Sequence, residues 1–149
     1  MEIIIFCGIQ ATGKTSFYLS RFFRSHVHLS LDILNTRNRE QRFMDVCFQT
    51  QQAFVIDNTN LTKADREKYI TQAKQYKYKV VAYYFQSKID DALQRNSYRE
   101  GKQNIPEVAV RGAFNKLEIP SLNEGFDELY YVEIDENNEF AIKPWTNEI

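Results

Sequence analysis

Five apolar segments alternate along the chain with longer segments in which apolar residues recur at helical spacing. The apolar segments are short and rich in β-branched and aromatic residues, so they are expected to form strands. They comprise residues 3–7, 26–31, 53–57, 79–85 and 128–134. The intervening segments predict helices at residues 15–23, 39–52, from Thr62 onward, 88–97 and 106–117. Strands that alternate with helices predict an α/β fold whose parallel sheet is covered by helices on both faces.

Local signals mark the ends of several elements. Thr62 followed three residues later by Asp65 predicts a capped helix start. Ser87 is expected to cap the helix from residue 88, and Pro106 suits a first helical turn. The chain shows no internal repeat and no interdomain linker, so we expect one domain over residues 1–149.

Side chains outside the obvious motifs are expected to serve packing. The residues after Asp135 are polar apart from 140–142 and Trp145, and are expected only to pad an edge of the sheet. His26 and His28 share one face of a strand, and with no Cys or third His nearby we expect packing rather than a metal site. Six aromatic residues recur at the spacing of buried positions and are expected to pack in the core: Phe17, Phe22, Phe23, Tyr83, Tyr84 and Phe85.

Composition narrows the class of protein. The apolar fraction of 43% and the charged fraction of 26% are ordinary for a globular domain. The net charge of −1 gives no general attraction to nucleic acid, so a polyanion site must be a local cluster. Cys7 and Cys47 cannot build a disulfide framework, so we expect reduced thiols, no disulfide-linked partner and a cytoplasmic location. No apolar segment approaches the ~20 residues that span a bilayer, and the first residues lack a basic leader, so neither membrane nor signal peptide is expected.

The segment GIQATGKT, from Gly8 to Thr15, matches the phosphate-binding pattern G-x-x-x-x-G-K-[ST]. Without side chains at Gly8 and Gly13, the backbone can curl around a phosphate and point its N–H groups inward. Lys14 would reach the β- and γ-phosphates, and the Thr15 hydroxyl can bind Mg²⁺. We therefore expect ATP to be held by Gly8, Ile9, Gln10, Ala11, Thr12, Gly13, Lys14, Thr15 and Ser16. A plain strand-to-helix turn is the alternative.

Two carboxylates follow neighbouring strands. Asp57 has no glutamate after it, which argues against water as the phosphoryl acceptor. We expect Asp57 to take a water of the metal shell or to fix a mobile basic residue. Asp32 follows the second strand, at the end of the sheet where ligands bind, and could take the proton of an attacking hydroxyl. A helix or turn cap is the alternative for both.

Arg95 and Arg99 are four residues apart, on one face of a helix end. A polar, glycine-containing segment follows, which suits a mobile lid over about residues 95–105. Two guanidinium groups closing over a triphosphate would neutralise transition-state charge and exclude water. A solvated basic helix end is the alternative.

Together these motifs resemble the kinase domain of polynucleotide 5′-hydroxyl kinases. The matching segments are GIQATGKT, Asp32, IDNTN (56–60), RNSYR (95–99), Ile105-Pro106 and IPSLNEGF (119–126), in the family's order. The resemblance implies a three-layer P-loop kinase fold, with a five-stranded parallel sheet of order 2-3-1-4-5 and a small lid. It also implies Asp32 as general base toward a 5′-hydroxyl, Arg95 and Arg99 as lid arginines on the donor phosphates, and Asp57 as a partner of the lid or the metal water.

The chain departs from the family at several positions. Gln10, Ala11 and Thr12 replace the loop's usual Pro and Gly, and Leu31 replaces an Arg before the base. Asn35 stands where the phage-type enzymes carry an Arg for the acceptor phosphate; Arg37 and Arg39, with Arg42 nearby, are expected to supply that contact.

The expected reaction is transfer of the γ-phosphoryl group of ATP, with Mg²⁺, to the 5′-hydroxyl of DNA or RNA. Two alternatives stay open: a kinase of a small hydroxylated metabolite, and a nucleotide-binding regulatory module that transfers nothing.

Overall fold

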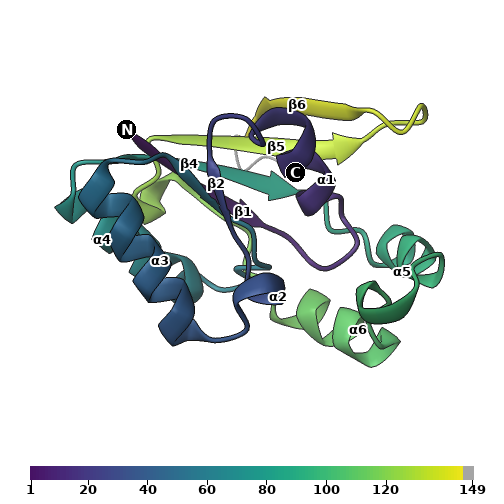
Figure 1. The fold of residues 1–149 in the computed structure, drawn as a ribbon. Helices are drawn as coiled ribbons and strands as arrows, with labels where there is room; N and C mark the ends of the chain where they lie inside the picture. Colours follow the sequence, from purple (N-terminus) through teal and green to yellow (C-terminus); the bar gives the residue numbers. More distant parts are fainter. Residues whose placement is uncertain (146–149) are drawn as a thin grey trace.

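The computed structural model describes residues 1–145, which form a twisted sheet with helices on both faces (Figure 1). The strands are β1 (Glu2–Cys7), β2 (Val27–Leu29), β3 (Phe54–Ile56), β4 (Lys79–Phe85), β5 (Glu128–Ile134) and β6 (Phe140–Pro144). Their order in the sheet is β2-β3-β1-β4-β5-β6. The first five strands are parallel, and the predicted order 2-3-1-4-5 is confirmed.

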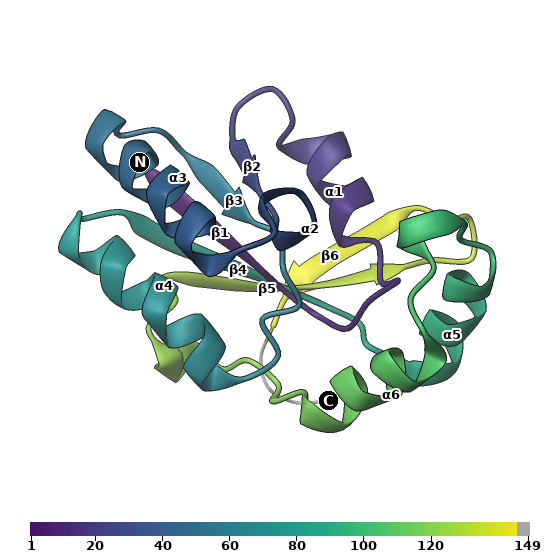
Figure 2. The ribbon, with the colours of Figure 1, turned by 60° about the horizontal axis from the view of Figure 1, so that its bottom comes forward.

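The helices are α1 (Lys14–Arg21), α2 (Leu31–Leu34), α3 (Arg37–Thr50), α4 (Lys63–Gln75), α5 (Ile89–Ser97) and α6 (Glu107–Lys116). Two 3₁₀ turns, η1 (Gly101–Gln103) and η2 (Leu122–Glu124), complete the described elements. α3 and α4 cover one face of the sheet and α1 the other, while α5 and α6 lie together beyond the end of β1 (Figure 2). The short helix α2 was not predicted.

Alternation along β1 builds both halves of the core. Ile3 and Ile5 face α3 and α4, whereas Ile4 and Phe6 face α1. All four are essentially inaccessible to water, so β1 is buried on both faces, as its unbroken apolar run predicts. The loop that leaves β1 is therefore carried by the most rigid part of the sheet.

The segment after Asp135 is a sixth strand, and the expectation that it only pads an edge was wrong. β6 pairs antiparallel with β5. Its Phe140 lies edge-on to Phe17 of α1, with ring centroids 5.1 Å apart. Just beyond it, Trp145 is buried on the opposite face and donates its indole N–H to the carbonyl of Pro120 at 3.0 Å. The sequence did not reveal β6, because a short strand with alternating polar residues has few apolar positions.

Two further expectations were wrong. Ser87 does not cap α5; its hydroxyl accepts the N–H of Ile9 at 3.2 Å and donates to Phe85 at 2.9 Å. Phe23 is 64% exposed, because α1 ends at Arg21 and the ring lies in the turn that follows. The Thr62–Asp65 capping box at the start of α4 is confirmed.

The two cysteines are free and buried, as expected. Burial raises the pKa of Cys7 to about 11, which keeps its thiol protonated. Across residues 1–145, no helix has the length and apolar character needed to cross a membrane.

Candidate active site at the carboxyl end of the sheet

The loop between β1 and α1 has the close backbone packing that its two glycines predict. A Cβ at Gly8 would lie 3.0 Å from the Cβ of Phe85. Gly13 has φ +92°, and a Cβ there would lie 3.0 Å from the ring of Phe140. Both positions therefore require glycine, one for close approach and one for backbone conformation as well. Between them, Ala11 takes a left-handed conformation, and the Thr12 hydroxyl closes the loop by donating to Ile9 at 2.8 Å.

The predicted loop residues differ in accessibility. Gly8, Ile9, Ala11 and Thr12 are buried; Gln10, Gly13 and Lys14 are partly buried; Thr15 and Ser16 are exposed at the start of α1. The loop thus presents the helix N-terminus and its hydroxyl residues to solvent, where an anion can reach them.

Lys14 turns its ammonium into the loop. Its Nζ donates to the carbonyls of Gly8 at 2.9 Å and Ile9 at 2.7 Å. Removal from water lowers the pKa of Lys14 to about 8, against the opposing effect of the Asp57 carboxylate. Desolvation makes this charge more responsive to a phosphate than a surface lysine would be.

Asp57, in the loop after β3, is joined to the P-loop helix by a hydrogen bond. The Thr15 hydroxyl donates to its Oδ2 at 2.9 Å. The imidazole Nε2 of His28, from β2, lies 2.8 Å from the same oxygen. His28 was assigned to packing, so the structure adds a polar contact that sequence reasoning missed. In the sheet His28 lies beside Val55, and Asp57 lies on the same face two residues further. That register cannot be known from sequence.

The rest of the IDNTN segment connects three strand ends. The carbonyl of Thr59 accepts the N–H of Gly8 at 3.0 Å, and the Asn60 side chain donates to Phe6 at 2.7 Å. Asn58 accepts the N–H of Leu31 at 2.9 Å, immediately before Asp32. The segment therefore fixes the positions of both the P-loop and the residue before the predicted base.

Asp32 is exposed on α2, and the alternative that it caps this helix was wrong. The Ser30 side chain is the cap, since it accepts the N–H of Asp32 at 3.3 Å. Within residues 1–145 the Asp32 carboxylate makes no hydrogen bond. Its charge opposes the lowering by burial of the pKa of both Lys14 and Arg99, so it lies within electrostatic range of the loop lysine and of the lid.

The two predicted lid arginines both lie near the loop, but they are held weakly. Arg95 donates to the carbonyl of Ala11 at 3.4 Å, and Arg99 donates to Gln103 within the lid at 3.4 Å. Burial lowers the pKa of Arg99, and the charge of Asp32 opposes that shift. Asn96 ties the two ends of the lid together, since its amide donates to Ile105 at 2.6 Å and accepts from it at 2.9 Å.

Within residues 1–145, neither Arg37 nor Arg39, the two arginines predicted to bind the acceptor, forms a hydrogen bond or ion pair with Asp32. Arg37 donates to Tyr69 at 2.8 Å and to Glu40 at 3.3 Å. Glu40 is a buried carboxylate that also accepts from Tyr69 at 2.8 Å and from Asn58 at 2.9 Å. Arg39 is exposed, and its backbone N–H donates to the Thr36 hydroxyl that caps α3. The Glu40 cluster (Arg37, Glu40, Asn58 and Tyr69) was missed, because it joins α3, α4 and the loop after β3.

The residues around Asp57 suit Mg²⁺ better than a metal held entirely by protein. Within residues 1–145, no group of three or more His, Cys, Asp or Glu could hold a metal ion. Mg²⁺ is usually held by one or two protein oxygens together with substrate phosphates and water. Thr15 and Asp57 offer two adjacent oxygen ligands beside the phosphate loop, so they fit an ion of this kind.

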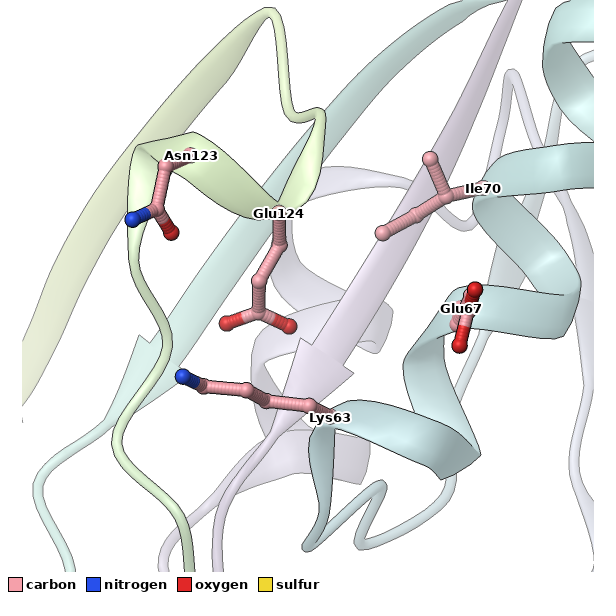
Figure 3. Close-up of a pocket in the computed structure, with 5 residues that line it drawn as sticks. All are labelled: Lys63, Glu67, Ile70, Asn123 and Glu124. Carbon is pink, nitrogen blue, oxygen red and sulfur yellow. The ribbon is translucent and has the colours of Figure 1, made fainter.

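A shallow pocket of about 370 Å³ lies elsewhere, between α4 and η2 (Figure 3). Lys63, Glu67, Ile70, Asn123 and Glu124 line it. The Glu124 carboxylate is already engaged by Arg66 of α4, at 2.9 and 3.1 Å. None of the predicted site residues lines this pocket, and the Arg66–Glu124 ion pair beside it attaches η2 to α4.

The sheet order and the loop at its centre are those of the P-loop kinase fold. The family match is more specific: the chain belongs to the AAA domain family, whose model matches residues 33–118. The matched residues include Asp57, Arg95 and Arg99, whereas the P-loop and Asp32 precede them.

A curated relative gives a more specific likeness. The chain is 25% identical over 129 residues to the bifunctional polynucleotide phosphatase/kinase of Schizosaccharomyces pombe. The match covers 84% of this chain and 32% of that protein, so the chain spans about a third of the relative's length.

Solved structures share the fold at lower identity. A gluconokinase from Sinorhizobium meliloti 1021 is similar with a TM-score of 0.63 and 14% identity, over 91% of this chain and 83% of that chain. Chaetomium thermophilum Kti12, solved in complex with ADP-AlF3, is similar with a TM-score of 0.63 and 16% identity, over 91% of this chain and 92% of that chain.

Proposed function

We propose that this domain transfers the γ-phosphoryl group of ATP to the 5′-hydroxyl of a DNA or RNA end. The observation that carries the proposal is the position of Asp32: Asn58 fixes Leu31, the residue before it, and the adjacent Asp57 is bonded to Thr15 at the end of the phosphate loop. A carboxylate at this end of the sheet that makes no hydrogen bond within residues 1–145 is suited to accept a proton from an attacking alcohol. The likeness to a polynucleotide phosphatase/kinase supports a 5′-hydroxyl as that alcohol.

The roles follow from the contacts. The loop backbone and Lys14 would bind the β- and γ-phosphates, with the Lys14 ammonium leaving its two carbonyl partners for the anion. Arg95 and Arg99 would close over the transferred group, which the weak contacts of the lid allow. Mg²⁺ bound near Thr15 and Asp57 would neutralise phosphate charge. Asp32 would orient the hydroxyl in line and take its proton.

A small hydroxylated metabolite is the second candidate acceptor. The contacts of Arg37 favour it, since Glu40 and Tyr69 already bond one nitrogen, Nη1, of the guanidinium that would contact a nucleic-acid phosphate. The near-neutral net charge points the same way. For a polynucleotide acceptor, Arg39 and Arg42 on the exposed side of α3 remain as phosphate contacts.

Incubation with Mg²⁺ and γ-labelled ATP tests these candidates against a panel of acceptors. The panel holds 5′-hydroxyl DNA and RNA oligonucleotides, the same oligonucleotides with a 5′-phosphate, sugars including gluconate, nucleosides, and buffer alone. Label on the 5′-hydroxyl oligonucleotides, and not on their 5′-phosphorylated controls, is the expected result. Label on a sugar or nucleoside would favour the metabolite kinase, and ATP binding with no labelled acceptor would favour a regulatory module.

Salt dependence gives a second criterion for the acceptor. Affinity for an oligonucleotide should fall steeply as salt rises, because each phosphate contact releases counterions. Replacing Arg39 and Arg42 together by Ala should reduce that slope if α3 carries the acceptor strand. Replacing Arg111, an arginine of α6 paired with Glu107 on the surface, is the matched control.

A further inference from the structure

His28 is placed to act on the nucleotide site rather than only to fill space. Its Nε2 lies 2.8 Å from Asp57 Oδ2, and the side chains of the two residues are 17% and 3% exposed. A carboxylate only accepts hydrogen bonds, so Nε2 must carry the proton in this contact. The bond therefore holds the orientation of the Asp57 carboxylate from the β2 side.

The ring of His28 is itself fixed by α1. It stacks on Tyr18 with ring centroids 4.0 Å apart and planes 16° from parallel. The Tyr18 hydroxyl donates to the backbone carbonyl of His26 at 2.6 Å, which ties α1 to β2. Since α1 begins at the phosphate loop, the loop and the imidazole are held in one packed unit.

The two hydrogen bonds to Asp57 fall on the same oxygen. Thr15 and His28 both bond to Oδ2. Within residues 1–145, Oδ1 has no hydrogen-bond partner, so it is the oxygen that can accept a bond from a metal-bound water. Rotation of the carboxylate would exchange the two oxygens and disturb the Thr15 hydroxyl, which is the metal ligand expected from the loop motif.

We propose that His28 is a positioning residue that sets how strongly Mg²⁺ promotes nucleotide binding. By donating from Nε2 it fixes the Asp57 carboxylate with Oδ1 open and Oδ2 bonded to Thr15. Partners of this kind, which orient a carboxylate near a metal, typically change metal affinity by about 10–100-fold when removed. The inference rests on the ATP and Mg²⁺ part of the proposed function and is independent of the acceptor.

The test is the affinity for ATP, measured by calorimetry with EDTA and again with excess Mg²⁺, in the absence of any acceptor. His28→Leu removes the donor, and His28→Gln keeps a donor near the position of Nε2. In wild type Mg²⁺ should tighten ATP binding. In His28→Leu that gain should shrink about tenfold or more while the affinity in EDTA stays close to wild type, and His28→Gln should restore most of it.

His26→Leu is the matched control. His26 lies just before β2 and also pairs with a carboxylate, Glu2, at 2.9 Å, whereas the bond to Asp57 comes from His28. Loss of His26 should leave the effect of Mg²⁺ unchanged. If His28→Leu does not fold, His28→Asn replaces it, since its shorter amide cannot reach Oδ2.

Two results would overturn the inference. One is that Mg²⁺ tightens ATP binding by as much in His28→Leu as in wild type. The other is an equal loss of ATP affinity with and without Mg²⁺, which marks a purely structural role. If Mg²⁺ promotes ATP binding as described but no oligonucleotide becomes labelled, only the proposed acceptor fails.

Discussion

The nucleotide side and the acceptor side of the site differ in how firmly they are built. On the nucleotide side, β1, the phosphate loop, α1 and the IDNTN segment are cross-linked by short hydrogen bonds, among them Thr15 to Asp57 at 2.9 Å and Asn60 to Phe6 at 2.7 Å. On the proposed acceptor side, Asp32 is exposed and each of the two lid arginines makes a long contact of 3.4 Å. One half of the site is therefore preorganised by short hydrogen bonds, whereas the other is held by few and long ones.

This difference explains why the chemistry of the donor is easier to infer than the identity of the acceptor. A phosphate is recognised by backbone N–H groups and one lysine, a solution that a short motif encodes. An acceptor is recognised by exposed side chains on separate elements, and no local pattern specifies their combination. Changes on the two sides should therefore have different signatures in ATP affinity and in transfer rate.

The largest expected effect belongs to the nucleotide side. Lys14→Ala should abolish phosphoryl transfer and weaken ATP binding, because the γ-phosphate loses its counter-charge. Labelled-product assays and calorimetry check the two parts. Lys77→Ala, an exposed lysine after α4, is the control. Transfer at the wild-type rate in the Lys14 variant would contradict the assignment of the loop.

On the acceptor side, Asp32→Asn should separate binding from chemistry. ATP affinity should stay near wild type while the transfer rate falls about 10²–10⁴-fold, the usual contribution of a general base. Single-turnover rates measure the loss, with Asp90→Asn on the exposed side of α5 as control. An unchanged rate would remove Asp32 from the mechanism.

The lid should give an intermediate result. Replacing Arg95 and Arg99 together by Ala should raise the ATP concentration needed for half-maximal rate and slow transfer by about 10²-fold, since two charged donors to the transferred group are lost. Steady-state kinetics over a range of ATP concentrations check both effects, and Arg111→Ala is the control. Kinetics identical to wild type would show that the lid arginines do not reach the phosphates.

The smallest effect is expected at the Glu40 cluster, which connects the two sides. Glu40→Gln should lower the free energy of unfolding by about 1–3 kcal/mol, since the buried Tyr69 hydroxyl and the partly exposed Arg37 guanidinium lose a charged acceptor. Denaturant unfolding measures this, with the exposed Glu67→Gln as control. Because Asn58 links the cluster to Leu31, a few-fold slower transfer with normal ATP affinity should accompany it. A variant as stable as wild type would mean that the cluster carries no net stabilisation.

Much of the fold was predictable because its strands are unusually clear. The bounds of β4 and β5 agree with the predicted segments, and the motif after β1 fixed the position of the phosphate loop. The second and third strands were predicted too long, because apolar residues that lie outside the ladder, such as Leu31 and Ala53, extend its apolar pattern. β6 was missed because its existence depends on pairing with β5, and pairing is not a local property.

The predicted site residues are those that lie in motifs. The structure joins Thr15 to Asp57, and Asp32 lies within electrostatic range of the loop, but the roles of all these residues stay predictions. His28 and Glu40 were missed because each makes its contacts with a neighbouring element, β3 for one and α4 for the other. The roles of Arg37 and Arg39 in acceptor binding also stay predictions, with Arg37 bonded to Glu40 and Tyr69.

The packing of Phe140 against Gly13 has a consequence for how this domain can vary. The Phe140 ring occupies the space that a side chain at position 13 would need, so segments near the two ends of the described chain are in contact here. A larger ring at 140, or a shift of β6 caused by an appended sequence, would press on the backbone beside Lys14. Because Gly13 also has φ +92°, a smaller residue at 140 should not make a side chain at position 13 acceptable. Fusions that begin close to β6 should be judged by their effect on nucleotide affinity as well as on solubility.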